Sequence, residues 1–189
     1  MWATILAHVG SMRRVAIIAS ASGNGKTTVG RELAERLGVP FVELDALVHG
    51  PGWVETPDDV LAAQLEPVLA SSGWVIDGTY RRKLGDRVLA TADLVVWLDL
   101  PIRVWLPRLV RRTGRRLIGR ETIWNGNRES LRGAVWGRDS LLRYALQSHF
   151  ARRRDWPGEL SAFPVIRLRT TAGVRAFLTG AARREGTEA

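Results

Sequence analysis

The sequence predicts a three-layer α/β/α fold, in which helices cover both faces of a five-stranded parallel sheet. Two observations support this prediction. Short apolar segments alternate with segments of helical periodicity along most of the chain, and the first apolar segment leads directly into a loop of small residues, 20–28. This alternation is typical of parallel sheets with right-handed crossovers. Ligands of such sheets bind at the carboxyl ends of the strands.

The loop after the first predicted strand, 15–18, has the pattern of a phosphate-binding loop (P-loop), G-x-x-x-x-G-K-[ST]. Its glycines let the backbone bend tightly and turn consecutive N–H groups inward, and the following helix adds partial positive charge. We therefore predict that it binds ATP, with Lys26 on the β- and γ-phosphates and the Thr27 hydroxyl on Mg²⁺. The residues predicted to bind the nucleotide here are Ser22, Gly23, Asn24, Gly25, Lys26, Thr27 and Thr28.

Ser20 departs from this motif, because it stands where the first glycine belongs. A serine fits at negative φ, whereas a positive φ would strain the loop by ~1–2 kcal/mol. Asn24 is of less concern, since asparagine tolerates left-handed geometry. The alternative is a chance turn rich in glycine and serine before a helix, which the flanking strand and helix disfavour.

Length and composition favour one domain, 12–183, preceded by an extension, 1–11, and followed by a flexible tail, 184–189. The chain has 189 residues and no cysteine, which excludes disulfides and Cys-ligated metals. No apolar run approaches the ~20 residues of a membrane span. The extension lacks the basic start of a signal peptide, so we expect a cytoplasmic protein without membrane contact. The oligomeric state is not indicated.

The first half of the chain contains three of the five predicted strands. A helix over 29–37 ends at Gly38, and a second strand, 41–44, ends in Asp45. Thr56 is predicted to cap a helix that runs to about residue 71, and Pro67 should kink it. The third strand, 74–76, ends in Asp77, and a short helix covers 82–90.

The second half supplies the other two strands and a predicted lid at about 113–137. The fourth strand, 94–98, leads through Asp99 into a helix over about 102–112, which Pro107 should bend or break. The polar, glycine-containing stretch 113–128 reads as a mobile excursion. The remaining predicted elements are a helix at 140–154, a strand at 165–168 and a helix at 172–182.

Two groups of residues resemble a known family. The segment DGTYR, residues 77–81, looks like the D-G-x-x-R segment of adenylate kinase-like nucleoside monophosphate kinases. More closely, LDAL at 44–47 with PGW at 51–53, followed by WVIDGTY at 74–80, is similar to small bacterial adenylate kinase-like or DNA-topology-modulation proteins. This resemblance covers about residues 13–155 and implies a P-loop kinase fold with ATP and Mg²⁺ as cofactors.

The same resemblance implies roles for polar residues that follow the strands. Asp77 should lie beside the P-loop, where it binds Mg²⁺ through water or positions the acceptor. Asp45 matches the aspartate that contacts the acceptor hydroxyl in shikimate and gluconate kinases, and Arg81 matches the arginine that holds the acceptor's anionic group. Trp53 lies beside the acceptor loop. The alternatives are that Asp77 is only a turn residue, that Asp45 caps a helix, and that Arg81 is a solvated surface residue. For Trp53 the alternative is packing in the core. Asp99 reads as a turn and cap residue.

Arginines concentrate in residues 103–154, which carry a net charge of +11. Arg108, Arg112 and Arg115 are spaced to share one helical face, from which they could neutralise the triphosphate when a lid closes. Arg108 and Arg112 are the predicted nucleotide ligands, with Arg112 also catalytic, and Arg111 and Arg116 belong to the same group. A nucleic-acid surface is the competing interpretation. A kinase lid needs arginines for the triphosphate, and the general preference of the chain for arginine, 26 against 2 lysines, is typical of a coding bias, so we favour these explanations over a nucleic-acid surface.

Two further features receive no firm role. The polar run 124–129 either gates the acceptor site or forms a turn, and His8, His49 and His149 lack metal-ligand spacing.

The prediction for function is an ATP- and Mg²⁺-dependent phosphotransferase that acts on a small acceptor. A nucleoside monophosphate is the first candidate, followed by a hydroxylated or antibiotic-like metabolite. A nucleic-acid-directed protein, such as a polynucleotide kinase or a nucleotide-binding regulator, is the second class. Nucleotide binding without turnover is the third.

Overall fold

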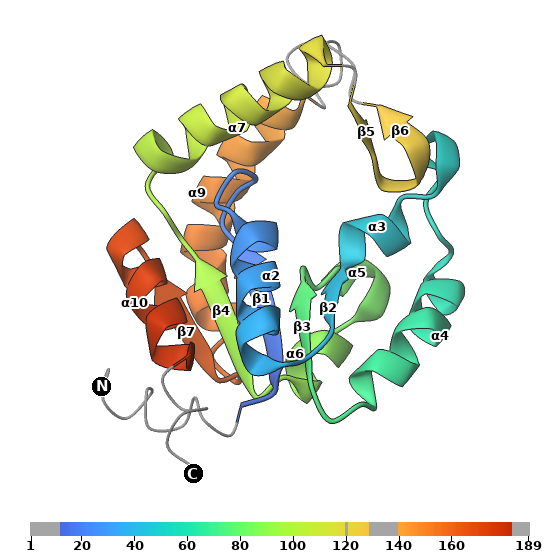
Figure 1. Cartoon of the computed structure of the whole chain (residues 1–189), viewed down its shortest axis with the longest axis vertical. Helices are drawn as coiled ribbons and strands as arrows, with labels where there is room; N and C mark the ends of the chain where they lie inside the picture. Colours follow the sequence, from blue (N-terminus) through green and yellow to red (C-terminus); the bar gives the residue numbers. More distant parts are fainter. Residues whose placement is uncertain (1–11, 120, 129–139, 183–189) are drawn as a thin grey trace.

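The computed structural model describes residues 12–119, 121–128 and 140–182. Its central sheet has five parallel strands in the order β2-β3-β1-β4-β7 (Figure 1), as the sequence predicts. The strands are β1 (Arg14–Ala19), β2 (Phe41–Glu43), β3 (Trp74–Asp77), β4 (Leu94–Leu98) and β7 (Val165–Leu168). The predicted extension 1–11, tail 184–189 and lid residues 129–137 lie outside the described residues.

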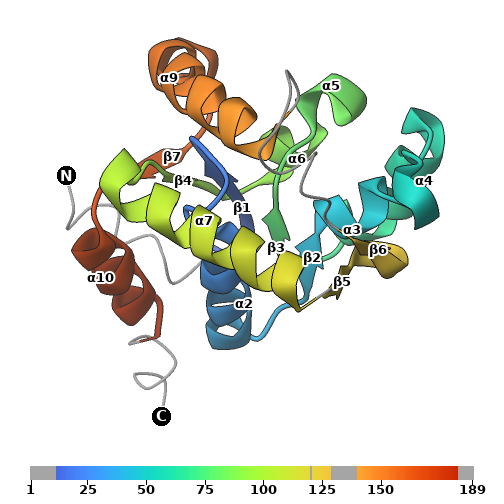
Figure 2. The ribbon, with the colours of Figure 1, turned by 90° about the horizontal axis from the view of Figure 1, so that it is seen from above.

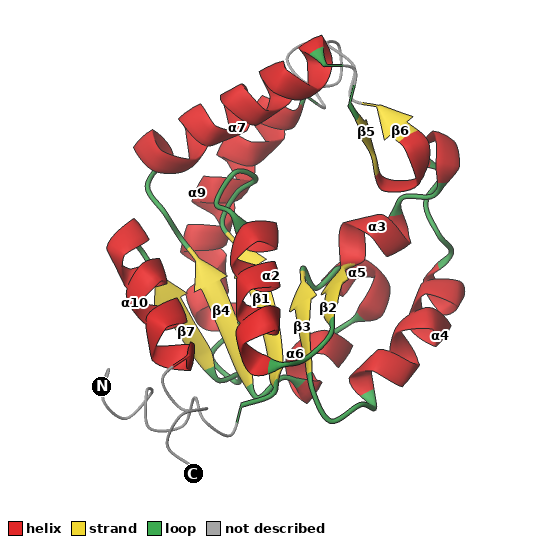
Figure 3. Ribbon diagram, in the orientation of Figure 1, coloured by secondary structure: helices red, strands yellow, loops and turns green. Residues whose placement is uncertain are grey.

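Helices surround this sheet, and a small antiparallel pair of strands lies apart from it (Figure 3). The α-helices are α2 (Lys26–Leu37), α3 (Leu44–Val48), α4 (Asp58–Leu69), α5 (Arg81–Leu84), α6 (Arg87–Thr91), α7 (Ile102–Ile118), α9 (Leu141–Glu159) and α10 (Thr171–Ala182). The short strands are β5 (Thr122–Ile123) and β6 (Asn127–Arg128), and the 3₁₀ turns are η2 (Pro51–Trp53) and η3 (Trp124–Gly126).

Alternate residues of the central strand β1 enter two different cores, because successive side chains of a strand point to opposite faces. Val15 and Ile17 pack with α2 and α10 on one face. Ala16 and Ile18 pack with α4, α6 and the end of α9 on the other. The view from above shows the sheet between these two layers (Figure 2), which confirms the predicted α/β/α arrangement.

Helix α7 differs most from its prediction, since it runs unbroken through Pro107 to Ile118. The expected break at Pro107 is wrong, and packing explains why. Trp105 and Leu109 are fully buried against Ala21 of the P-loop and Ala145 of α9, so tertiary contacts outweigh the hydrogen bond that proline removes. Helix α4 likewise continues through its proline, Pro67.

The structure differs from the sequence prediction in two smaller ways, at the start of α4 and in the helix predicted over 82–90. Helix α4 begins at Asp58 with Pro57 at its N-cap, and the hydroxyl of Thr56 instead donates to the carbonyl of Leu47 at 2.6 Å, so the predicted Thr56 cap is wrong. The helix predicted over 82–90 is two short helices, α5 and α6, separated at Gly85, whose φ is +59°. Left-handed geometry at a glycine is a common way to end a helix.

Within the described part of the chain, the helices are too short or too polar to cross a lipid bilayer.

Two glycines in helices allow a matched test of packing. An added Cβ at Gly30 of α2 would collide with the ring of Phe41, whereas at Gly114 of α7 it would meet open space. We expect Gly30→Ala to lower the free energy of unfolding by about 1–3 kcal/mol. Gly114→Ala should raise it by about 0.5–1 kcal/mol, because alanine favours helix. Urea denaturation of both variants measures the difference, and equal effects would contradict the close approach of α2 and β2.

Candidate active site

The P-loop joins β1 to α2 at the carboxyl edge of the sheet. Gly23 and Gly25 have φ values of +85° and +89°, so both occupy the left-handed region that favours glycine. A Cβ at Gly23 would also lie 2.6 Å from the carbonyl oxygen of Trp105, which means that α7 packs directly on the loop. The backbone conformation therefore requires glycine at both positions, as the motif predicts.

Ser20 fits the loop without strain, because its φ is negative. Its side chain is buried, donates to Oδ1 of Asp99 at 2.7 Å and accepts from the indole nitrogen of Trp97 at 2.8 Å. The departure from the glycine motif thus adds two hydrogen bonds between the start of the loop and β4. Asn24, which also has negative φ, makes two side-chain hydrogen bonds. Its amide donates to the Ala21 carbonyl within the loop (2.8 Å), and its oxygen accepts from the Leu100 N–H after β4 (2.9 Å).

Asp77 lies beside the P-loop, as its place after β3 predicts, since β3 pairs with β1. Its carboxylate is 2% exposed. One oxygen forms an ion pair with the ammonium group of Lys26, and the other accepts a hydrogen bond from the Thr27 hydroxyl at 2.7 Å. Three side chains that the sequence assigned to phosphate and metal binding therefore converge on one point.

This convergence is compatible with ATP and Mg²⁺. Hydroxyl and carboxylate oxygens are the ligands that Mg²⁺ prefers, and Mg²⁺ is held in such sites by one or two protein oxygens together with phosphate. Thr27 and Asp77 supply those oxygens within 2.7 Å of each other. The left-handed glycines and the N-terminus of α2 present N–H groups to an anion at the same place.

Asp99 has a different role from the one predicted. The N-cap of α7 is Pro101, without a side-chain cap, so the interpretation of Asp99 as a cap is wrong. Its buried carboxylate instead accepts from Ser20 and forms ion pairs with Arg167 at 2.7 Å and Arg153 at 3.3 Å. Asp99 thus ties the P-loop to β7 and α9.

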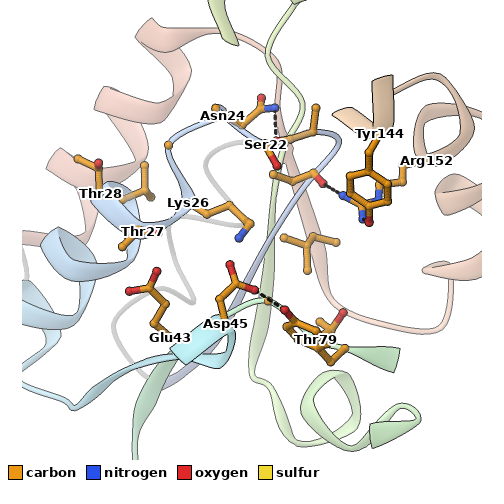
Figure 4. A pocket seen from close by; sticks show the side chains of 18 of the residues that line it. Ser22, Asn24, Lys26, Thr27, Thr28, Glu43, Asp45, Thr79, Tyr144 and Arg152 are labelled. Carbon is orange, nitrogen blue, oxygen red and sulfur yellow. Dashed lines mark hydrogen bonds between the residues drawn. The ribbon is translucent and has the colours of Figure 1, made fainter. Parts of the chain in front are cut away.

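Asp45 faces the P-loop from α3, and Figure 4 shows it and Lys26 entering the cleft from opposite sides. The N-cap of α3 is Glu43, so the alternative of a capping Asp45 is wrong. Oδ1 of Asp45 accepts from the Tyr80 hydroxyl at 2.5 Å, and Nε2 of His49 lies 3.3 Å from that hydroxyl. Burial, followed by the charge of Asp45, raises the pKa of Tyr80 well above its usual range.

The segment 122–128, which the sequence predicts to be part of a mobile excursion, packs against the loop at 46–56. We call this loop, which follows Asp45, the acceptor loop. The indole of Trp124 donates to Glu43 at 3.0 Å, and the amide of Asn125 donates to the carbonyls of Ala46 and His49. Asn127 accepts from the Trp53 N–H at 3.0 Å and donates to the Gly50 carbonyl at 2.9 Å. The turn at η3 therefore closes one side of the cleft, next to residues 43–53.

Four rings meet where this segment docks. His49 stacks on Trp124, with ring centres 5.8 Å apart and planes at 29°, and meets Trp53 edge-on at 5.5 Å. Tyr80 lies 6.4 Å from the His49 ring. We call His49, Trp53, Tyr80 and Trp124 the aromatic wall. Trp53 was predicted to lie beside the acceptor loop, and the run 124–129 was predicted either to gate the acceptor site or to form a turn. The contacts of His49 and Tyr80 with Trp124 were missed because the pairing of 46–53 with 122–128 is a long-range contact.

Arginines of α7 line the opposite part of the cleft, as the predicted lid arginines should. They are Arg108, Arg112, Arg115 and Arg116. Arg152 of α9 joins them, and its guanidinium donates to the Ala19 carbonyl at 2.9 Å and to the Tyr144 hydroxyl at 3.1 Å (Figure 4). The sequence placed Arg152 on a helix but gave no signal that this helix face adjoins the P-loop.

Arg81 lines the same cleft but is already bonded to protein carboxylates. Its guanidinium donates to Asp86 at 2.6 Å and to Glu159 at 2.9 Å. The hydrogen bond that Arg81 donates to Asp86 is the largest cause of the raised pKa of Arg81. The predicted contact of Arg81 with an anionic acceptor would compete with both of these ion pairs.

Together these groups surround one continuous cleft of about 2300 Å³ at the carboxyl ends of the strands. The P-loop and the α7 arginines form one part, and Glu43, Asp45 and the aromatic wall form the other. A parallel five-stranded sheet with this loop, the Lys26–Asp77 pair and an arginine-lined helix above it is the arrangement of the P-loop kinase superfamily.

Comparisons with known proteins agree with this class. The family model described as shikimate kinase matches residues 22–50. The shikimate kinase of Ruegeria pomeroyi is 27% identical over 132 residues, which cover 61% of this chain and 66% of that protein. The chain thus spans less than two thirds of that relative's length, and only 56% of another curated shikimate kinase.

Solved structures establish the same fold. The shikimate kinase of Acinetobacter baumannii in complex with shikimate has a TM-score of 0.54 and 17% identity, and the match covers 92% of this chain and 93% of that one. A gluconokinase from Sinorhizobium meliloti 1021 has a TM-score of 0.52 and 24% identity over the same shares of the two chains. The comparisons support the superfamily, without singling out the narrower adenylate kinase-like group.

The bond between Tyr80 and Asp45 predicts a pH effect. Because the folded protein holds the Tyr80 proton above the ordinary tyrosine pKa of about 10, the unfolded chain releases that proton first, and the free energy of unfolding should fall as pH rises above about 10. Tyr80→Phe should show a smaller fall. Urea denaturation between pH 8 and 11 measures both, and identical slopes would contradict the buried hydrogen bond.

Proposed function

We propose that the protein is an ATP- and Mg²⁺-dependent phosphotransferase that transfers the γ-phosphoryl group to a hydroxyl of a small acceptor. The observation that carries this proposal is the position of Asp45. It faces Lys26 and Thr27 across the cleft (Figure 4), so a hydroxyl bound between them would lie next to both a carboxylate and the terminal phosphate.

In this proposal the P-loop N–H groups and Lys26 bind the β- and γ-phosphates, while Thr27 and Asp77 hold Mg²⁺, which neutralises charge on the phosphates. Arg108 and Arg112 stabilise the negative charge that moves during transfer. A bond forms between the acceptor oxygen and the γ-phosphorus as the bond to the β,γ-bridging oxygen breaks. Asp45 orients the acceptor hydroxyl and takes its proton late in the step.

Several acceptors fit this reaction type. The resemblance to nucleoside monophosphate kinases favours a nucleotide, and the curated relatives and solved structures are named for shikimate and gluconate. A hydroxylated or antibiotic-like metabolite requires the same machinery. All of these place the transferred phosphoryl group between Lys26 and Asp45.

A nucleic-acid-directed function is the competing class, motivated by the +11 charge of 103–154. The positions of Arg108, Arg112, Arg115, Arg116 and Arg152 in the cleft support a nucleotide-binding use for part of that charge. Binding of DNA or RNA that falls steeply with salt would favour the competing class, and no binding at 50 mM salt would favour the kinase.

Lys26 and Lys83 are the two lysines of the chain and give a matched pair of variants. We expect Lys26→Ala to abolish ATP binding or turnover, because the P-loop ammonium group is lost. Lys83→Ala should keep the ATP affinity of the parent, since Lys83 pairs with Glu55 and Asp58 away from the P-loop. Isothermal titration with ATP measures both. Phosphoryl transfer by Lys26→Ala at the parent rate would overturn the proposed site.

Asp77→Asn tests the metal-binding part of the site. The variant keeps the shape of the side chain but loses the charge next to Thr27, so affinity for Mg·ATP should fall about tenfold or more, and affinity for metal-free ATP should fall less. Asp155→Asn, which removes an exposed carboxylate paired with Arg154, is the control. Equal losses with and without Mg²⁺ would argue against a metal at Asp77.

A further inference from the structure

The acceptor part of the cleft has its cations neutralised by neighbouring carboxylates. Arg81 donates to Asp86 and Glu159, and the ammonium group of Lys83 lies 3.0 Å from Glu55 and 2.9 Å from Asp58. The hydrogen bonds that Arg81 and Lys83 donate to those carboxylates raise the pKa of both basic groups. An anionic acceptor would therefore have to break existing ion pairs before it could use either cation.

Carboxylates are the main charged groups that this part of the cleft presents. Asp45 and Glu43 point toward the P-loop from α3 and the end of β2 (Figure 4). Glu55, Asp58, Asp86 and Glu159 line the same part, where two carboxylates face each of the cations Lys83 and Arg81. Glu43 also pairs with Arg31 of α2 at 3.4 Å, and the exposed Arg82 lines this part as well. Among these described residues the six carboxylates outnumber the four cations, so a carboxylate or phosphate bound here would meet a net negative charge.

The aromatic wall adds a second, independent feature beside those carboxylates. Trp53 is 42% exposed and lines the cleft together with His49, Tyr80 and Trp124. The indole of Trp124 is held in place by its hydrogen bond to Glu43. Ring faces next to carboxylates favour a cation, because the electron-rich face of the indole attracts positive charge. Flat ring surfaces also accommodate the C–H face of a cyclic polyol.

The two parts of the cleft thus differ in the sign of the net charge of their lining residues. The part that receives the triphosphate is lined by Lys26 and by arginines of α7 and α9, and the part that receives the acceptor is lined by carboxylates and rings. This separation lets a cationic acceptor and an anionic donor bind side by side, with each attracted to its own part.

We infer that, within the proposed kinase reaction on which this inference rests, the acceptor is a cyclic polyhydroxyl amine. It is a sugar-like or cyclitol-like ring with at least one protonated amine and without a carboxylate or phosphate. The ring lies against the aromatic wall, the ammonium group takes the place of the exposed Arg31 side chain on Glu43, and one hydroxyl reaches Asp45 for phosphorylation.

A panel of matched acceptors tests this inference, with ATP consumption as the readout. D-Glucosamine, 2-deoxystreptamine and kanamycin A carry amines. N-acetyl-D-glucosamine and D-glucose are neutral, and D-gluconate, shikimate and AMP are anionic. We expect kcat/KM for at least one amine to exceed that of every neutral or anionic compound by about tenfold or more, the value of one charged hydrogen bond.

A charge variant tests the same inference through the protein. Glu43→Gln keeps an oxygen acceptor for Trp124 but loses the negative charge, and with it the ion pair to Arg31, so KM for the amine acceptor should rise about tenfold or more with KM for ATP unchanged. Glu66→Gln removes the same charge from α4 outside the cleft, where Glu66 pairs with Arg87 at 3.7 Å, and should change neither value. Equal changes in both KM values of Glu43→Gln would contradict the inference.

The outcomes separate this inference from the proposed function. Preference for gluconate, shikimate, AMP or a neutral sugar overturns the inference and leaves the kinase proposal standing. Binding of Mg·ATP without phosphorylation of any amine in the panel also overturns the inference. Failure of the parent protein to bind ATP, or parent-like transfer by Lys26→Ala, overturns the proposed function instead.

Discussion

The carboxylate of Asp77 is the group on which the nucleotide side of the site depends. It is buried between β1 and the start of α2, where it pairs with Lys26 and accepts from Thr27. A buried charge is costly unless it is paired and hydrogen-bonded, so these contacts fix the positions of all three side chains. Because β3 lies next to β1 in the sheet, the strand order itself brings Asp77 to the P-loop.

The P-loop is also anchored on its other side, through β4. Two side-chain hydrogen bonds of Ser20 connect the loop to Asp99 and Trp97, and one of Asn24 connects it to Leu100, while the Asn24 amide also bonds Ala21 within the loop. Asp99 is itself held by arginines from β7 and α9. The loop is thus held from both neighbouring strands, which orders its N–H groups before any phosphate binds and reduces the entropy cost of binding.

The acceptor side is built differently, from segments far apart in the chain. Residues 46–53 and 122–128 meet through side-chain amides and the aromatic wall, and the carboxylates beside them neutralise Arg81 and Lys83. This gives the acceptor part a chemistry opposite to that of the phosphate part. The sequence resemblance assigned Arg81 to an anionic acceptor, whereas in the structure its guanidinium pairs with two protein carboxylates, Asp86 and Glu159.

The sequence by itself determined the five parallel strands, the P-loop, and the placement of Asp77 at the end of β3 and of Asp45 shortly after β2, because these follow from local periodicity and from the geometry of parallel sheets. Only the tertiary structure decided that α7 continues through Pro107, that Ser20 bonds Asp99, and that Trp124 docks beside Glu43. Each of these depends on contacts between distant segments, which stabilise conformations that local propensity does not favour.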